Sequence, residues 1–273
     1  MITQQDFNSL VNSFLNLTKI IQGEPIDKGS EWKNDAQMLS IKCAKSAISL
    51  NHLAGCLHVL QDERGQVEFI DHSSVAILGR SVFEASLALN YAFCHTSPEV
   101  REFRYLLWVY GGLFERSKIT PLTEHGKERK SENEILLLQK KEEIINNPFF
   151  EKFDKNKKRN VISSGNWRPE HAWIDIAEMA GYDRKYFSNI YNFLSGHAHA
   201  SYISVLQTRD AAYSIDDQGR LSSSVRDMCA VVIAKLALDY VRIFPKAEVA
   251  LLDDKALHEA FIFWSSLASQ SSY

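Results

Sequence analysis

The chain has 273 residues, 45% of them hydrophobic, and its 31 basic and 34 acidic side chains leave a net charge of −3. A chain of this length can bury a large core. Its near-neutral net charge argues against a protein that binds nucleic acid over most of its surface, although a local basic patch is compatible with that charge. The start of the chain has no basic stretch before a long apolar run, and no segment offers about 18 uninterrupted apolar residues, so we expect neither a signal peptide nor a membrane span.

The glycine, proline and cysteine content indicates the fold class and the cellular compartment. Twelve glycines and six prolines are few for this length, which favours long helices over a β-rich fold. None of the four cysteines forms a C-x-x-C pair, and each lies in an apolar stretch: Cys43, Cys56, Cys94 and Cys229. We therefore expect buried, reduced thiols and a cytoplasmic protein.

Apolar residues at helical spacing predict four helices in the first part of the chain. They cover residues 6–22, a long helix from Asn34 or Asp35 to Gln61, one from Asp71 or Ser73 to before Pro98, and one over 98–119. Residues 62–70 are predicted to be a turn.

The character of the sequence changes over residues 120–165, which combine a charged amphipathic helix with a basic run. We interpret this region as a protruding or mobile excursion and the basic run as a surface loop. Further helices are predicted over 169–181, from Asp183 into an uncharged window, over 222–244 and over 254–268, with a turn at 214–220. The result is an all-α fold, one multi-helix bundle of about nine helices that forms a single domain over 1–273.

The third predicted helix carries only two formal charges, Arg80 and Glu84, between residues 72 and 98. Their i, i+4 spacing places them on one helix face, which Tyr91 continues. Two readings stay open, because a buried ion pair is costly to desolvate. Arg80 either ties helix ends together with Glu84 as its counter-charge, or offers its donors to an anion while Glu84 orients it or acts as a base.

The uncharged window, residues 186–208, gathers polar and titratable side chains: Tyr191, Asn192, Ser195, His197, His199, Ser201 and Tyr202. If the helix continues through Gly196, Tyr191, Ser195 and His199 share one face and His197 points elsewhere. If Gly196 breaks it, an extended His-Ala-His could chelate a metal. No helical His-x-x-x-His is present and no cysteine lies close in sequence, so we predict no metal and no cofactor. Ser195 lacks the G-x-S-x-G context of a hydrolase nucleophile.

These elements carry a resemblance. The chain is similar to an uncharacterised family of helical prokaryotic proteins, a domain of unknown function. That family pairs an R-x-x-x-E helix with a Y-x-x-x-S-x-x-x-H helix. The matching segments here are R-S-V-F-E-A, then W-x5-W-I-D-I-A-E-M-A-G and Y-N-F-L-S-G-H-A-H-A-S. The likeness runs from Ile77 to Ser201. It implies an all-α fold in which the two elements meet, and no established activity.

The family also loosely resembles the HEPN helical domains, many of which are ribonucleases of stress and defence. Their signature places an arginine and a histidine a few residues apart on one helix, and no arginine of this chain is followed by a histidine at that spacing. A ribonuclease therefore requires Arg80 and His199 to meet from separate helices.

Three hypotheses follow. The first is a cytoplasmic binding or regulatory module, in a bacterial stress or phage-defence system by analogy, with an unknown protein partner or a nucleotide or RNA ligand. Its binding residues would be Tyr191, Ser195, His197 and Tyr91, beside Arg80, Glu84 and His199.

The second hypothesis is a metal-independent ribonuclease or nucleotide-acting phosphodiesterase, with His199 as acid/base, Arg80 as phosphate clamp and Glu84 orienting them. The third is a purely structural or assembly protein. A C-terminal stripe of Phe261, Trp264 and Leu267 suits either the core or a homodimer.

Overall fold

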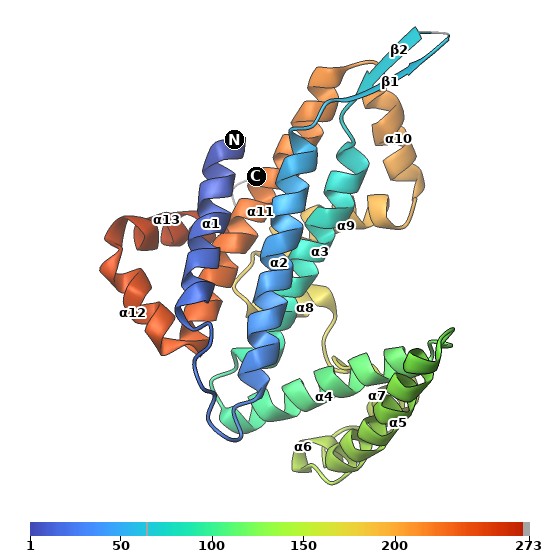
Figure 1. Ribbon diagram of the computed structural model, residues 1–273, viewed down its shortest axis with the longest axis vertical. Helices are drawn as coiled ribbons and strands as arrows, with labels where there is room; N and C mark the ends of the chain where they lie inside the picture. The colour runs from blue at the N-terminus through green and yellow to red at the C-terminus, as the bar shows by residue number, and fades with distance from the viewer. Residues whose placement is uncertain (64, 270–273) are drawn as a thin grey trace. The chain divides into compact units, whose positions relative to one another are not determined.

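The computed structural model describes residues 1–63 and 65–269. In these residues the chain forms thirteen α-helices, one short 3-10 helix and one two-stranded hairpin, which confirms the all-α class (Figure 1). The chain divides into two compact units: residues 1–89 with the chain from Trp173 onward, and residues 90–172. That the two units act as a single domain stays a prediction.

The first unit holds most of the helices and a central long one, α11. Its elements are α1 (Gln4–Ile20), α2 (Trp32–Ala54), β1 (His58–Asp62), β2 (Gly65–Phe69), α3 (His72–Phe93, whose last residues enter the second unit), α8 (Trp173–Met179), α9 (Arg184–Ala198), α10 (Tyr202–Ala211), α11 (Ile215–Ile243), α12 (Pro245–Asp253), α13 (Lys255–Ser266) and η1 (Leu267–Ser269).

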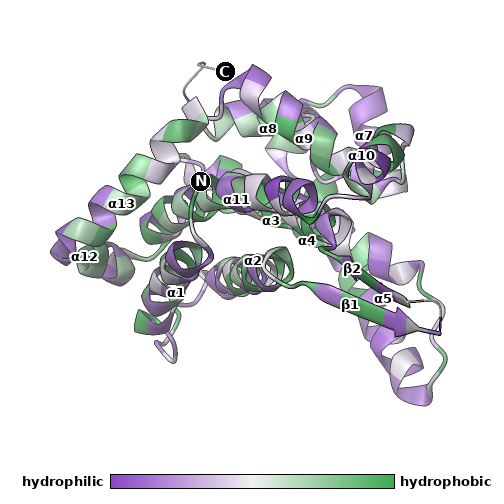
Figure 2. Ribbon diagram, turned by 90° about the horizontal axis from the view of Figure 1, so that it is seen from above, coloured by the Kyte–Doolittle hydropathy of each residue, from purple (hydrophilic) through white to green (hydrophobic). Residues whose placement is uncertain are grey.

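Three layers build this unit. Seen from above, α3 and α11 lie between α1 and α2 on one side and α8 and α9 on the other (Figure 2). Fully buried alanines on α11, among them Ala230, Ala234 and Ala237, let its neighbours approach closely. Phe261, in the C-terminal stripe, is also fully buried and so belongs to the core. Self-association through this stripe stays a prediction.

The second helix ends earlier than predicted, and the predicted turn at 62–70 is wrong. α2 stops at Ala54, because Gly55 follows, and the chain then forms an antiparallel hairpin in which His58 faces Phe69. The two rings stack at 5.0 Å between centroids. Alternation around Val59 and Val67 was the available signal, but each strand is only five residues long.

The predicted turn at 214–220 is also wrong, because it is the first part of α11. Ser214 caps this helix by accepting a hydrogen bond from the backbone N–H of Asp217 at 3.1 Å. Acidic residues in a first turn stabilise a helix start, and here they outweigh Gly219. The expected count of about nine helices is low because four further helices are not among those predicted: α6 (Pro148–Glu151), α7 (Lys155–Ser164), α10 and α12.

The second unit contains α4 (Pro98–Ser117), α5 (Glu124–Ile145), α6 (Pro148–Glu151) and α7 (Lys155–Ser164). They share a core of Phe103, Leu107, Tyr110, Ile144, Phe150, Phe153 and Val161. The basic run forms α7 and not a loop, because Asp154 caps it and Gly165, with φ of 67°, ends it. Lysine ammonium groups lie over the nearby phenylalanine rings, as Lys152 does over Phe149 at 4.9 Å. Mobility of residues 120–165 stays a prediction.

Candidate functional site

The first half of the site stands on α3. Gly79 lets this helix pack closely, since a Cβ there would lie 2.6 Å from Val225 Cγ1 of α11. Arg80 follows directly, and its Nε donates a hydrogen bond to Glu84 Oε1 at 2.9 Å. The two side chains are 18% and 30% exposed, so the ion pair is partly desolvated but open to solvent.

The second half stands on α9, which begins and ends at well-defined residues. Asp183 caps its start by accepting from the backbone N–H of Tyr186 at 2.7 Å. Its end is fixed by Ala200, whose φ of 48° lies in the left-handed region, and His199 is the last residue before it. Of the two geometries left open by the sequence, the helical one is present over His197 and Ala198.

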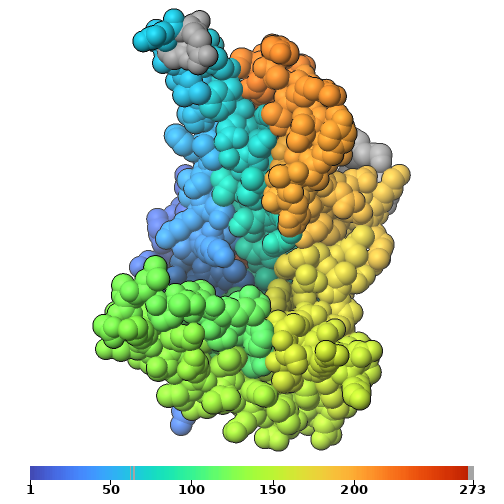
Figure 3. Space-filling view, turned by 90° about the vertical axis from the view of Figure 1, so that its right-hand side faces the viewer, coloured from blue at the N-terminus to red at the C-terminus, as the bar shows by residue number. Residues whose placement is uncertain are grey.

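The two halves meet through four side chains, which we call the Arg80 cluster: Arg80, Glu84, Tyr191 and His199. Arg80 Nη1 lies 2.7 Å from His199 Nε2, and Arg80 Nη2 donates to the Tyr191 hydroxyl at 3.2 Å. That hydroxyl donates to Glu84 Oε1 at 2.7 Å, which closes the network. Figure 3 shows α3, in teal, beside the yellow-orange α9–α10 segment on one face of this unit.

The hydrogen bonds fix how protons are arranged in the cluster. A guanidinium can only donate, so His199 Nε2 accepts from Arg80 and the ring proton sits on Nδ1. Burial, helped by the hydrogen bond to Glu84, raises the pKa of Tyr191 to about 12, so the phenol stays a neutral donor. Burial alone would lower the pKa of Arg80, but the hydrogen bonds and charge interactions with Glu84 and Tyr191 together outweigh burial and raise that pKa. The cluster is therefore one cation and one anion with two neutral polar groups.

Two predicted members of the pocket behave differently. Ser195 Oγ is buried and has no hydrogen-bond partner among the described residues. His197 points away from the cluster: its Nε2 lies 2.8 Å from Gln207 Oε1, and its ring packs edge-on against His72 at 5.8 Å. Burial lowers the pKa of His197. His72, a buried residue at the start of α3, was not among the sequence candidates, because nothing in its local sequence distinguishes it.

Tyr91 lies in the second unit, in an aromatic setting of its own. Its ring is 5.8 Å from Trp167 and 5.7 Å from His171, and the Arg104 guanidinium carbon lies 4.1 Å from its centroid. Burial raises its pKa. Tyr91 does not share in the hydrogen bonds of the Arg80 cluster described above.

The remaining predicted chemistry concerns metals and thiols. Because His197 and His199 turn toward different partners, they form no His-x-His chelate. No group of three or more His, Cys, Asp or Glu side chains within the described residues is placed to hold a metal ion. Cys43 and Cys229 are buried free thiols, whereas Cys56 and Cys94 are only partly buried. Burial raises the pKa of Cys43 to about 12, so this thiol is unreactive.

Comparison with known proteins gives a family but no activity. A model of a family of unknown function, DUF5677, matches residues 42–212 and thus includes the whole Arg80 cluster. No curated protein and no solved structure gives a significant match. None of the helices described is long and apolar enough to cross a membrane. The matched segment is well over half of the chain, and it confirms the resemblance to a helical family without known function, while the likeness to HEPN domains stays a prediction. The chain belongs to the family of unknown function DUF5677.

Proposed function

We propose that the Arg80 cluster binds a phosphate-bearing ligand, a nucleotide or RNA, and that the protein is a helical binding or regulatory module. The observation that carries this proposal is the 2.7 Å contact between Arg80 and His199, which joins residues 119 positions apart. A role in bacterial stress or phage defence would follow only from the likeness to HEPN domains, which is an analogy.

The donors of Arg80 support a phosphate as the ligand. A guanidinium has five N–H donors, and the hydrogen bonds to Glu84, His199 and Tyr191 use three of them. One N–H on each terminal nitrogen remains and can donate to phosphate oxygens. Glu84 and Tyr191 hold the guanidinium in place, so the Arg80 side chain loses less conformational entropy when a ligand binds.

A second candidate, a metal-independent ribonuclease or phosphodiesterase, is favoured by the same contact, because a phosphate on Arg80 would place its ester oxygens beside His199. With RNA, the His199 imidazole would take the proton of the 2′-hydroxyl as its oxygen attacks phosphorus. The same proton would then pass to the departing 5′-oxygen, leaving a 2′,3′-cyclic phosphate. Arg80 would stabilise the charge that develops on phosphorus, and Glu84 would orient Arg80.

Calorimetric titration tests both candidates with inorganic phosphate, AMP and a short oligouridine, all in the presence of EDTA. Arg80→Met removes the donors and should weaken binding by roughly tenfold or more. The matched controls are Arg209→Met, an arginine of α10 whose side chain is 66% exposed, and His52→Ala, an exposed histidine of α2. Neither control should change binding. Cleavage of the oligouridine that His199→Ala abolishes at an unchanged melting temperature would establish the second candidate.

Two results would overturn the proposal. One is that the wild-type protein binds none of the three ligands. The other is that Arg80→Met binds as the wild type does. If Arg80→Met and His199→Ala both fail to fold and the wild type binds nothing, the cluster is structural.

A further inference from the structure

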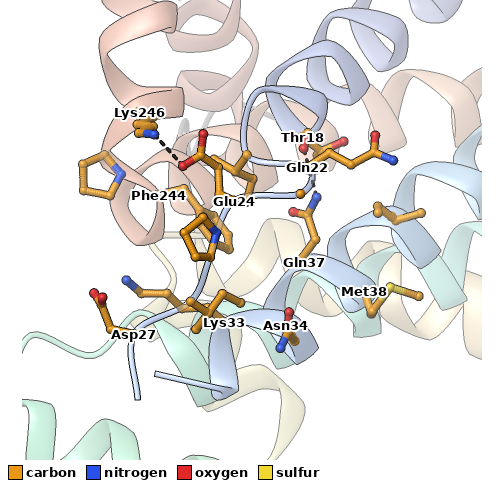
Figure 4. A pocket seen from close by; sticks show the side chains of 16 residues that line it. Thr18, Gln22, Glu24, Asp27, Lys33, Asn34, Gln37, Met38, Phe244 and Lys246 are labelled. Atoms are coloured by element: carbon orange, nitrogen blue, oxygen red, sulfur yellow. Dashed lines mark hydrogen bonds and ion pairs between the residues drawn. The ribbon is translucent and has the colours of Figure 1, made fainter. Parts of the chain in front are cut away.

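The first unit also contains a pocket of about 410 Å³, formed where the end of α1, the start of α2 and the junction of α11 and α12 meet (Figure 4). No member of the Arg80 cluster is among the described residues that line it. Its volume lies within the range of ~300–1,000 Å³ usual for small-molecule sites. The pocket therefore has room for a ligand of its own.

Backbone conformation keeps this space open. The segment between α1 and α2 passes through Gly23 and Gly29, whose φ values of 81° and 86° lie in the left-handed region that favours glycine. On the opposite side, Phe244 leaves helical conformation with φ −122° and ψ 90°, and Pro245 then starts α12. The connecting segment between α1 and α2 and the break at Phe244 between α11 and α12 leave the space of the pocket open.

Several polar groups of the pocket wall already form hydrogen bonds or ion pairs with other residues of the chain, and these bonds hold the wall in place. The Gln37 amide donates to the Thr18 carbonyl at 2.9 Å and accepts from the Tyr240 hydroxyl at 2.5 Å. At the rim, Lys246 and Glu24 form an ion pair of 2.5 Å, which ties the connecting segment to α12. Figure 4 shows this pair and the Gln37 amide on the pocket wall.

The inner surface is largely apolar. It includes Ile21, Ile26, Met38, Ile41 and Phe244. Met38 lines the pocket and is 62% exposed, so it lies at the rim. A flexible thioether in this setting adapts to the shape of an apolar ligand, so the pocket suits a molecule with a hydrocarbon or aromatic body.

One end of the pocket offers uncommitted polar groups. Lys33 and Asn34 lie in the first turn of α2 and line the pocket, and no ion pair or side-chain hydrogen bond joins either to another residue in the described part of the chain. The Lys33 ammonium lies over the adjacent Trp32 ring, 5.8 Å from its centroid. These groups supply one positive charge and one amide donor, which together suit a carboxylate.

The charges around the pocket disfavour a ligand with two negative charges. Asp27 and Glu24 place two carboxylates among the lining residues, against the ammonium groups of Lys33 and Lys246. A dianionic phosphate would lie close to these carboxylates, and like charges disfavour binding. We infer that the pocket binds an amphipathic monocarboxylate, with its apolar body against Met38 and Phe244 and its carboxylate at Lys33.

The probe is decanoate, compared with decanol and decyl phosphate by calorimetric titration of the full chain. Decanoate should bind saturably at one site and raise the melting temperature, and both analogues should displace bound decanoate only weakly. Lys33→Met should weaken decanoate binding by roughly tenfold, whereas Lys28→Met, an exposed lysine of the same connecting segment outside the pocket lining, should not. Met38→Trp should fill the pocket and block binding without unfolding the protein, because this side chain is exposed.

Absence of saturable decanoate binding to a folded wild-type protein would overturn the inference. So would equal binding of decanol, or binding that both Lys33→Met and Met38→Trp leave unchanged. Arg80→Met should bind decanoate normally, which separates this site from the Arg80 cluster.

Discussion

The Arg80–Glu84 pair should be energetically coupled, and a double-mutant cycle on stability measures that coupling. Arg80→Met removes the guanidinium but keeps much of its apolar stem, and Glu84→Gln keeps the shape of the side chain without its charge. Arg80 bonds three partners, at 2.9, 2.7 and 3.2 Å, and its loss leaves a carboxylate that is only 30% exposed without its counter-charge. We expect Arg80→Met to lower the free energy of unfolding by about 2 kcal/mol.

Glu84→Gln should cost less, about 1 kcal/mol, because the amide oxygen can still accept from Arg80 and from the Tyr191 hydroxyl. The coupling should be about 1 kcal/mol, which lies between the ~0.3–0.5 kcal/mol of exposed helical pairs and the ~3–5 kcal/mol cost of breaking a fully buried pair. The double variant should therefore lose about 2 kcal/mol, roughly 1 kcal/mol less than the two single variants together.

Urea unfolding followed by circular dichroism and tryptophan fluorescence provides the values, and coincident transitions of the two probes are required to use them. Effects that add within about 0.5 kcal/mol would refute the reasoning, because independent sites behave in this way. In that case the 2.9 Å contact contributes nothing measurable, and Glu84 does not hold Arg80 in place.

Three further predictions concern the elements that position the site. Gly79→Ala should destabilise the protein by about 1–3 kcal/mol in thermal unfolding, because the new Cβ would lie 2.6 Å from Val225 Cγ1; a neutral result would mean that α3 and α11 are not tightly packed. Asp183→Ala should cost about 1 kcal/mol through loss of the α9 cap, and Asp183→Asn less. Because burial lowers the pKa of His197, the unfolded chain binds a proton at higher pH than the folded one. Stability should therefore fall as pH drops below about 6.5 toward the lowered pKa, and His197→Asn should flatten that fall in urea midpoints measured across this range.

The meeting of Arg80 with His199 could be predicted from the sequence for a physical reason. An ion pair in an otherwise uncharged helix and polar groups in an otherwise uncharged window both need partners that water does not supply. The simplest solution is that they satisfy each other, as the contacts of Arg80 with Tyr191 and His199 do. The family resemblance pointed to the same two elements.

The direction of His197 could not be predicted, because it depends on where α9 ends. That end is set by Ala200 in a left-handed conformation, which alanine rarely adopts and which no propensity foretells. The hairpin around Val59 and Val67 was missed for a related reason. Most of its residues are exposed and each strand has only five residues, so the alternation is too short to indicate a strand.

The two sites proposed above differ in their relation to the family. All four residues of the Arg80 cluster lie within residues 42–212, the segment that the family model matches, whereas every described residue that lines the monocarboxylate pocket lies outside it. The family resemblance therefore gives a reason to look for the Arg80 cluster in other members, and it gives none for the pocket. The two sites also favour different ligand chemistry, since the free donors of Arg80 suit a phosphate and the carboxylates among the lining residues of the pocket disfavour one. Decyl phosphate carries both an apolar body and a phosphate, so it should compete with AMP at the Arg80 cluster while failing to displace decanoate from the pocket.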